Sequence, residues 1–288
     1  MQNNIQRFFS PGDQWLYYNI FCGYNSADHI LIEHLSSLSQ SLLSQNLIDQ
    51  WFFIRYNDPS YHIRYRIRIK DQTHLGLIIN TFNKLLENLV SDEYIWKLQI
   101  DSYTREIERY GLSSMELAEK IFFHDSNMII NILNSLDENQ ENIRSLFALK
   151  LVDFYLTIFN FSIAEKLNFT EKLRNHFYSE FNIEKNTKKQ FDKLYAENKN
   201  RIDDFLNKKN KKINKKLIAD CASKILDLKE KKLLNVDFYS LISSFIHMSL
   251  NRLFVGDNRM HELVTYDFIW RYYKKEHYFS TSKTDHEN

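Results

Sequence analysis

The sequence predicts an α+β fold, in which an N-terminal ferredoxin-like βαββαβ sheet half packs on a mainly helical C-terminal half. Residues 13–112 alternate short runs of aromatic and β-branched residues with segments whose apolar residues recur every three or four positions. Residues 113–273 keep the helical period almost throughout. With 5 Gly and 2 Pro in 288 residues, the chain also lacks the turn residues of a β-sandwich.

The sheet half is predicted element by element. A turn signal at 11–13 precedes a strand over 15–21, and Ser26 is expected to cap the helix that follows, with apolar residues up to Leu43. The other predicted elements are a strand over 51–56, a turn over 57–60, a strictly alternating strand over 62–69, a helix over 73–89 and a strand over 95–104.

The helical half begins at a capping-box pattern over 113–116, and a second helix start is predicted at Asp125-Ser126. Helices are predicted over 141–161, 237–253 and 263–273, with a polar, Lys-rich helical stretch over 169–234 and a polar, mobile tail over 274–288. No linker separates the halves. We therefore expect residues 1–273 to form one domain.

Composition and charge exclude several classes of protein. Aromatic residues reach 15%, which excludes disorder of the whole chain, and a formal net charge of +1 argues against a strongly cationic nucleic-acid binder. The basic run over 207–216 is interpreted as a solvated surface, with an acidic peptide or an RNA backbone as the alternative partner. No signal peptide or membrane-spanning run is found in the sequence. Cys22 and Cys221 are the only cysteines, which excludes a disulfide framework. We expect a cytoplasmic protein.

Three arginines project from one face of the strand over 62–69. Arg64, Arg66 and Arg68 are spaced two residues apart, about 6.6 Å, and no acidic residue alternates with them. His62 extends the same face. Like charges repel unless an anion lies among them, and guanidinium groups bind carboxylates and phosphates. The alternative is a solvated strand face, but the pattern favours an anion site.

Two more motifs carry candidate chemistry. In REIERYG, one helical turn would bring Glu106 and Arg109 together, either as an exposed ion pair or as part of a site. In FIHMSLNRL, His247 lies among apolar residues and is either a packed core residue or a general base. Asn251 shares its helix face, and Arg252 follows. No metal-ligand spacing, nucleotide-binding loop or serine-hydrolase motif is found, so no metal or cofactor is predicted.

The motifs follow one another in the order of a known family. A W-x-Y strand comes first, then WFFIRYNDPSYHIRYRI, then EIERYG followed by MELAEKIFFHDS, and finally SFIHMSLNRLFVGDNRMHE. Over residues 13–273 the chain resembles the thiopeptide-type bacteriocin biosynthesis domain. This domain is also the C-terminal elimination domain of class I lantibiotic dehydratases.

The resemblance implies a lyase. In this family a separate domain or protein esterifies Ser or Thr of a ribosomally made precursor peptide with glutamate from glutamyl-tRNA. The elimination domain then removes the glutamate and leaves dehydroalanine or dehydrobutyrine. The glutamylation domain is absent from this sequence, so the resemblance implies a separate glutamylating partner. No cofactor, metal or direct contact with nucleic acid is implied.

The functional residues of the family match positions of this chain. The resemblance implies that His247 is the catalytic base, that Arg64 and Arg66 bind the glutamyl carboxylates or the enolate, and that Glu106 orients Arg109 or an arginine of the strand. Four neighbouring side chains are also expected to contact the substrate: His62, Arg68, Asn251 and Arg252.

Two other functions remain open. Free-standing members in thiopeptide pathways join two dehydroalanines in a formal 4+2 cycloaddition to form a pyridine, and retention of all five matched residues favours elimination over this reaction. Alternatively, the chain is a non-catalytic subunit that presents the peptide, for example at a sheet edge. Elimination predicts a basic cleft where the face of Arg64 meets the helix of His247, with a channel for several peptide residues.

Overall fold

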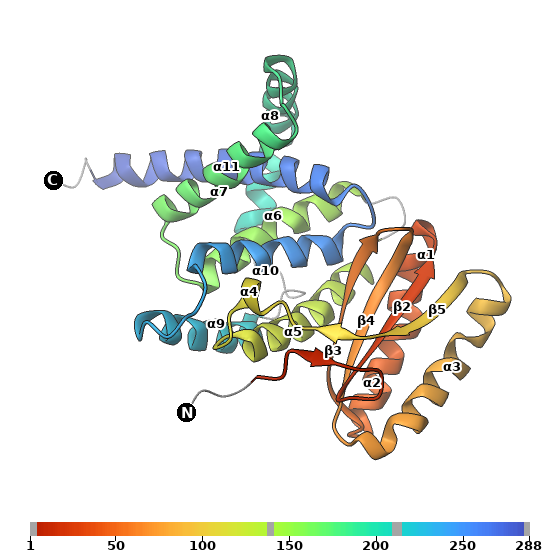
Figure 1. The fold of residues 1–288 in the computed structure, drawn as a ribbon. Coiled ribbons are helices and arrows are strands. Elements are labelled where there is room, and N and C mark those ends of the chain that lie inside the picture. The colour runs from red at the N-terminus through yellow and green to blue at the C-terminus, as the bar shows by residue number, and fades with distance from the viewer. Residues whose placement is uncertain (1–4, 137–140, 209–214, 285–288) are drawn as a thin grey trace.

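A computed structural model describes residues 5–136, 141–208 and 215–284 of the protein. A sheet with its helices forms one side of the molecule, and the C-terminal helices form the other (Figure 1). The strands are β1 (Phe8–Phe9), β2 (Trp15–Cys22), β3 (Ile48–Asn57), β4 (Tyr61–Ile69), β5 (Ile95–Asp101) and β6 (Tyr103–Thr104).

The main sheet has the strand order β3-β4-β2-β5, and every neighbouring pair is antiparallel. The helices between its strands are α1 (Tyr24–His29), the π-helical η1 (Ile30–Leu35), α2 (Ser36–Ser44), the 3-10 turn η2 (Gln72–His74) and α3 (Leu75–Ser91). This order of strands and helices is that of a ferredoxin-like βαββαβ unit. The predicted fold class is therefore confirmed.

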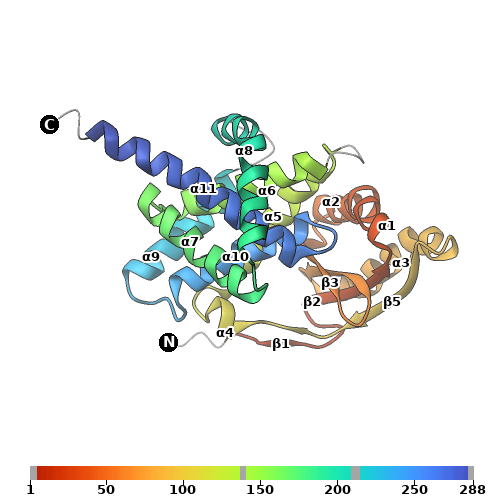
Figure 2. The same cartoon turned by 90° about the horizontal axis from the view of Figure 1, so that it is seen from above.

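Alternation along β4 assigns its two faces. Ile63, Tyr65 and Ile67 are fully buried, and the Tyr65 ring lies 5.9 Å from Phe82 of α3, so this face packs under the helices. The arginines point to the opposite face, which α1, α2 and α3 leave uncovered in the view from above (Figure 2).

Two details of the sheet half differ from the prediction. β6 pairs with the short N-terminal strand β1, so residues 103 and 104 leave the main sheet instead of continuing β5. α1 begins after Gly23 and has no side-chain cap, which makes the predicted cap at Ser26 wrong. Asp28, in that helix, instead binds Arg55 at 2.5 Å and Arg144 at 2.7 Å.

The C-terminal helices are α4 (Ile107–Tyr110), α5 (Met115–Leu133), α6 (Glu141–Ile158), α7 (Ile163–Glu180), α8 (Lys185–Asn207), α9 (Lys215–Glu230), α10 (Phe238–Leu253) and α11 (Asn258–Thr284). α11 continues well past residue 273, so the predicted helix end is wrong and residues 274–284 of the expected tail are helical. Lys275, within that extension, pairs with Asp203 of α8 at 2.6 Å. Residues 209–214 of the basic run lie outside the described part.

α5 runs without interruption through Asp125 and Ser126, so the predicted second helix start is wrong. The Asp125 carboxylate lies inside α5 and does not cap the start of a helix. It is fully buried and accepts hydrogen bonds from Tyr155 of α6 and from Ser249 and Arg252 of α10. A buried carboxylate needs such partners, because an unpaired buried charge is strongly destabilising.

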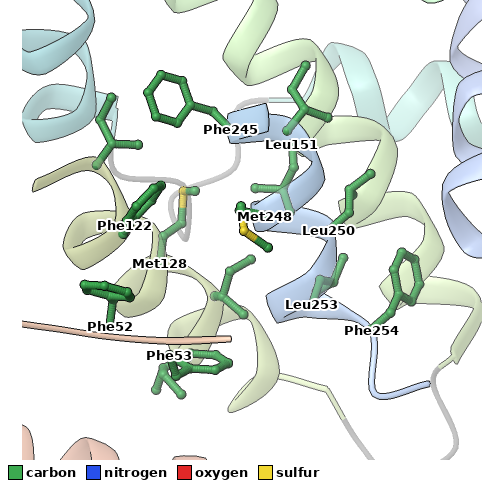
Figure 3. Close-up of a cluster of buried hydrophobic side chains, with 14 of the residues drawn as sticks. Phe52, Phe53, Phe122, Met128, Leu151, Phe245, Met248, Leu250, Leu253 and Phe254 are labelled. Atoms are coloured by element: carbon green, nitrogen blue, oxygen red, sulfur yellow. The ribbon is translucent and has the colours of Figure 1, made fainter. Parts of the chain in front are cut away.

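The two halves share one hydrophobic core. Phe52 of β3 packs against Phe122 of α5 with ring centroids 5.3 Å apart, and Phe245 and Met248 of α10 extend the same cluster (Figure 3). The sheet and the helices therefore pack on one another, and α10 is held directly against β3.

Candidate active site

Hydrogen bonds fix α10 on the edge strand β3. The Arg55 backbone N–H donates to the Asn251 side-chain oxygen, and the Asn251 amide donates to the Arg55 carbonyl, both at 2.9 Å. Arg252 Nε donates to the Phe53 carbonyl at 2.7 Å. Asn251 and Arg252 thus hold the helix that carries His247 against the sheet, a role that their spacing alone did not reveal.

His247 is oriented by a buried carboxylate. Its Nδ1 lies 2.7 Å from Oε1 of Glu262 in α11, and the Glu262 side chain is only 2% exposed. A carboxylate accepts Nδ1–H, which leaves the Nε2 lone pair free to take a proton. The imidazole is about a quarter exposed and lines a hollow of about 770 Å³ with Tyr56 and Asn251. An imidazole held in this way can act as a general base.

Glu262 is not among the site residues predicted from the sequence. It lies 15 residues after His247 on a different helix, although it belongs to the stretch GDNRMHE that follows the His247 motif. Helical spacing cannot pair residues across a turn between helices. The only signal in the sequence was a glutamate inside an already selected motif.

Arg66 is a buried cation that forms no salt bridge within the described residues, although the exposed Glu106 carboxylate is near enough to raise its pKa. The residue is 8% exposed, and its guanidinium lies over the rings of Tyr17 (4.2 Å), Tyr103 (4.9 Å) and Phe52 (5.3 Å). No hydrogen bond joins it to any residue of the described ranges, and its buried Nε has no partner there. Burial lowers the pKa of Arg66, and the nearby Arg64 lowers it further. Such a site favours binding of an external anion.

Arg64 lies beside Arg66 and is positioned by His62. Its guanidinium lies 3.4 Å from the centre of the Tyr56 ring, and its Nε donates to His62 Nε2 at 3.2 Å. His62 Nδ1 lies 2.8 Å from the Ser60 carbonyl. Burial lowers the pKa of His62, which favours the neutral ring that can accept from Arg64. His62 thus contributes to the site by positioning Arg64.

Glu106 and Arg109 meet as their spacing predicts. Arg109 Nη1 lies 3.4 Å from Glu106 Oε2, and Gly111 ends the turn with a φ of 76°. Arg109 also donates from Nε to Ser244 Oγ at 3.0 Å. Ser244 precedes His247 by one helical turn, so α4 brings Arg109 to the face of α10 that carries His247.

Arg68 is already paired. Its guanidinium binds both carboxylate oxygens of Asp49 in β3, at 2.7 and 2.6 Å. No acidic residue alternates with the arginines along their own strand, but the partner of Arg68 comes from the adjacent strand. Arg68 therefore does not share the unpaired state of Arg66.

The site follows the contact between β3 and α10. Tyr56 and His247 line one hollow, and Ile54 and Met248 line a smaller cavity. Each cavity is thus lined by one residue of β3 and one of α10, and these residues are close in sequence to those of the other cavity. Arg66 and Glu106 line the smaller cavity. In residues 5–136, 141–208 and 215–284 no three His, Cys, Asp or Glu side chains gather as metal ligands would. None of the helices in these ranges is long and apolar enough to cross a membrane.

Residues 15–273 match the family model described as "Lantibiotic biosynthesis dehydratase C-term". The chain belongs to this family. The lantibiotic dehydratase C-terminal family thus accounts for nearly the whole chain, including both the sheet half and the helical half.

Relatives in this dehydratase family are much longer than the chain. It is 29% identical over 276 residues to the nisin biosynthesis protein NisB of Lactococcus lactis subsp. lactis, covering 93% of this chain and 26% of the relative. It is 28% identical over 271 residues to the subtilin biosynthesis protein SpaB of Bacillus subtilis, covering 88% and 25%. The chain thus spans about a quarter of the length of these relatives.

Solved structures share the fold of this dehydratase domain. The tRNA-dependent lantibiotic dehydratase MibB of Microbispora sp. 107891 superposes with a TM-score of 0.64 at 18% identity, over 90% of this chain and 28% of its own. The pyridine synthase TbtD from thiomuracin biosynthesis superposes with a TM-score of 0.66 at 10% identity, over 91% and 99%. Because the two TM-scores are similar, the fold alone does not distinguish a dehydratase from a pyridine synthase.

Proposed function

We propose that this chain eliminates glutamate from glutamylated Ser or Thr residues of a ribosomally made precursor peptide, leaving dehydroalanine or dehydrobutyrine. One observation carries the proposal. His247, held by the buried Glu262 carboxylate, lies on the helix next to a cavity lined by Arg66, a buried cation whose Nε has no hydrogen-bond partner among the described residues. Elimination from a glutamyl ester needs this combination of a base and an anion site.

The residues divide the reaction between them. His247 Nε2 takes the Cα proton of the esterified residue, and the electrons of that C–H bond form the Cα=Cβ double bond. The Cβ–O bond breaks, and its electrons leave with the carboxylate of glutamate. Negative charge develops on the peptide carbonyl oxygen and on the leaving group. Arg64 and Arg109 supply donors for it, and preorganised donors stabilise charge that develops in a transition state.

Glu106 and Glu262 act on other residues of the site. Glu262 holds the tautomer and orientation of the His247 ring, and Glu106 restrains Arg109. The Glu262 carboxylate also stabilises the imidazolium that forms when His247 takes the proton.

The substrate requires a second enzyme. A precursor peptide carries glutamyl esters only after a separate glutamylating enzyme has used glutamyl-tRNA, so that enzyme is the proposed partner, and both would act in the cytoplasm. The elimination itself is an acid–base reaction in which no cofactor takes part.

The proposal is tested by mass spectrometry with three peptides of one sequence. One carries Ser, one carries glutamylated Ser, and one carries two dehydroalanines at a spacing that permits ring closure. Elimination predicts that only the glutamylated peptide changes, by loss of one glutamic acid. Consumption of the bis-dehydroalanine peptide alone would identify a cycloaddition enzyme. Binding without any conversion would identify a peptide-presenting subunit.

A further inference from the structure

Two arginines bind the last turn of α10, the helix that carries His247. Arg55 Nε donates to the Arg252 carbonyl at 2.9 Å, and Arg144 Nη1 donates to the Leu253 carbonyl at 2.6 Å. Leu253 is the last residue of α10 (Figure 3). The final carbonyls of a helix lack partners within the helix and carry partial negative charge, so guanidinium groups are stabilising at this position.

One carboxylate joins the two arginines. Asp28 of α1 accepts from Arg55 through Oδ1 at 2.5 Å and from Arg144 through Oδ2 at 2.7 Å. Burial raises the pKa of Asp28, but the two guanidinium groups outweigh it and hold the pKa below its ordinary value, so the carboxylate is ionised. Two cations still exceed one anion. The remaining positive charge faces the negative end of α10, which makes the helix end part of the cluster.

The cluster is nearly closed to water. The side chain of Arg55 is 1% exposed and that of Arg144 is 12% exposed. Arg55 also donates to the Tyr61 hydroxyl at 3.1 Å. Water cannot easily replace a bond that is lost in such a place, so the bonds define one geometry. Three elements, α1, β3 and α6, thus hold the end of α10.

The bound carbonyls lie between the two residues of the base pair. His247 precedes them by five and six residues, about 8–9 Å along the helix. Residues 254–257 form the turn to α11, which begins at Asn258 and carries Glu262 in its second turn. A shift of this turn therefore changes the position of Glu262 relative to His247, whose hydrogen bond measures 2.7 Å.

We propose that Asp28 is a positioning residue for the base His247. It holds the two arginines on the last carbonyls of α10, and so keeps the His247 ring at hydrogen-bond distance from Glu262. The inference rests on the proposed elimination and adds to it a residue of the sheet half that does not line the hollow of His247. Without the Asp28 charge, the two guanidinium groups repel each other and the end of α10 moves.

The kinetic test compares Asp28→Asn with Asp267→Asn, because Asp267 also binds two arginines. Its partners are Arg174 at 2.8 Å and Arg271 at 2.6 Å, and within the described residues neither donates to α10. Both variants should lower the melting temperature. Only Asp28→Asn should lower kcat on the glutamylated peptide, by roughly tenfold or more with KM nearly unchanged, because a displaced base affects the transition state more than binding.

The second readout is the Nδ1–H proton of His247, observed by NMR in the ¹⁵N-labelled protein without substrate. A proton that a buried carboxylate accepts exchanges slowly with water, and its resonance is assigned by its absence from His247→Ala. Asp28→Asn should remove the resonance or raise its exchange rate roughly tenfold, while Asp267→Asn should keep it. Arg144→Met should show a smaller change of the same kind. It retains the pair of Asp28 with Arg55, and so serves if Asp28→Asn does not fold.

Three results would overturn the inference. They are a resonance that is absent from the wild type, one that is unchanged in Asp28→Asn and Arg144→Met, and one that both aspartate variants lose alike. A lower kcat in Asp28→Asn with an unchanged resonance would also overturn it, because Asp28 would then act on something other than the base. The proposed function is judged separately. If His247→Ala eliminates glutamate as fast as the wild type, that function fails, whatever the resonance shows.

Discussion

Glu262 Oε1 lies 2.7 Å from Nδ1 of His247, and its side chain is almost completely buried while the imidazole keeps access to a hollow. The two residues come from α10 and α11, which a short turn joins. A buried carboxylate and a partly exposed imidazole form the pair that a general base requires, because the carboxylate fixes the tautomer and stabilises the protonated ring.

Replacing Glu262 by Gln should slow elimination without weakening substrate binding. The amide can keep the ring in place but no longer stabilises the imidazolium, so kcat should fall by roughly tenfold or more while KM stays near that of the wild type. Steady-state kinetics on a glutamylated peptide checks this. Glu197→Gln is the control, since Glu197 pairs with Lys193 on the surface of α8. Equal losses in both variants would assign Glu262 a structural role only.

Replacing Arg66 by Met should separate activity from stability. The guanidinium is buried against aromatic rings and forms no salt bridge within the described residues, so removing its charge should leave the free energy of unfolding within about 1 kcal/mol of the wild type, or higher. The same change should raise KM for the glutamyl ester strongly. Urea unfolding and kinetics on one protein preparation check the two parts. A large loss of stability would mean that Arg66 serves the fold.

Asp125→Ala should destabilise the whole molecule. Asp125 connects α5 with Tyr155 of α6 and with Ser249 and Arg252 of α10, and its loss leaves Arg252 as a buried, unpaired charge. Breaking a buried ion pair costs about 3–5 kcal/mol. Urea unfolding should show a lower midpoint and a free energy of unfolding reduced by this amount. A shift below about 1 kcal/mol, the range of surface pairs, would contradict this account of how α10 is held.

Acid should remove part of the stability through His62. Burial holds the folded-state pKa of His62 below its usual value near 6.5, so between the two values the unfolded chain binds more protons. This contribution is complete above about pH 6.5 and is lost as the pH falls through the folded-state pKa. The melting temperature of His62→Gln should therefore fall less than that of the wild type between about pH 7 and pH 5. Parallel curves would contradict the neutral, hydrogen-bonded ring.

Local periodicity predicted most of the fold. The strict alternation in β4 and the apolar spacing in α3 and α10 each reflect burial of one face, and burial is visible in a single segment. Asp125-Ser126 misled because these residue types commonly start helices. In this fold Asp125 meets Arg252, 127 residues away, and such a partner leaves no trace in the local pattern.

The candidate site was predictable only where one segment carries it. Glu106 and Arg109 lie one turn apart, and their ion pair followed from that spacing. Three interactions join separate segments and could not be predicted from the sequence. They are the hydrogen bond of His247 with Glu262, the ion pair of Arg68 with Asp49, and the hydrogen bond from Asn251 to the backbone of β3. Each depends on how elements pack, so the sequence identified the residues but not their division of roles.

His247 is the proposed base of a glutamate elimination. The most direct measurement is mass spectrometry of a glutamylated Ser peptide, carrying the leader of its precursor, after incubation with the wild type, with His247→Ala and with His176→Ala, in which an exposed histidine is removed. The account predicts loss of one glutamic acid with the wild type and His176→Ala, and a rate lower by roughly a hundredfold or more with His247→Ala. Equal conversion by all three proteins, or conversion by none, would contradict it.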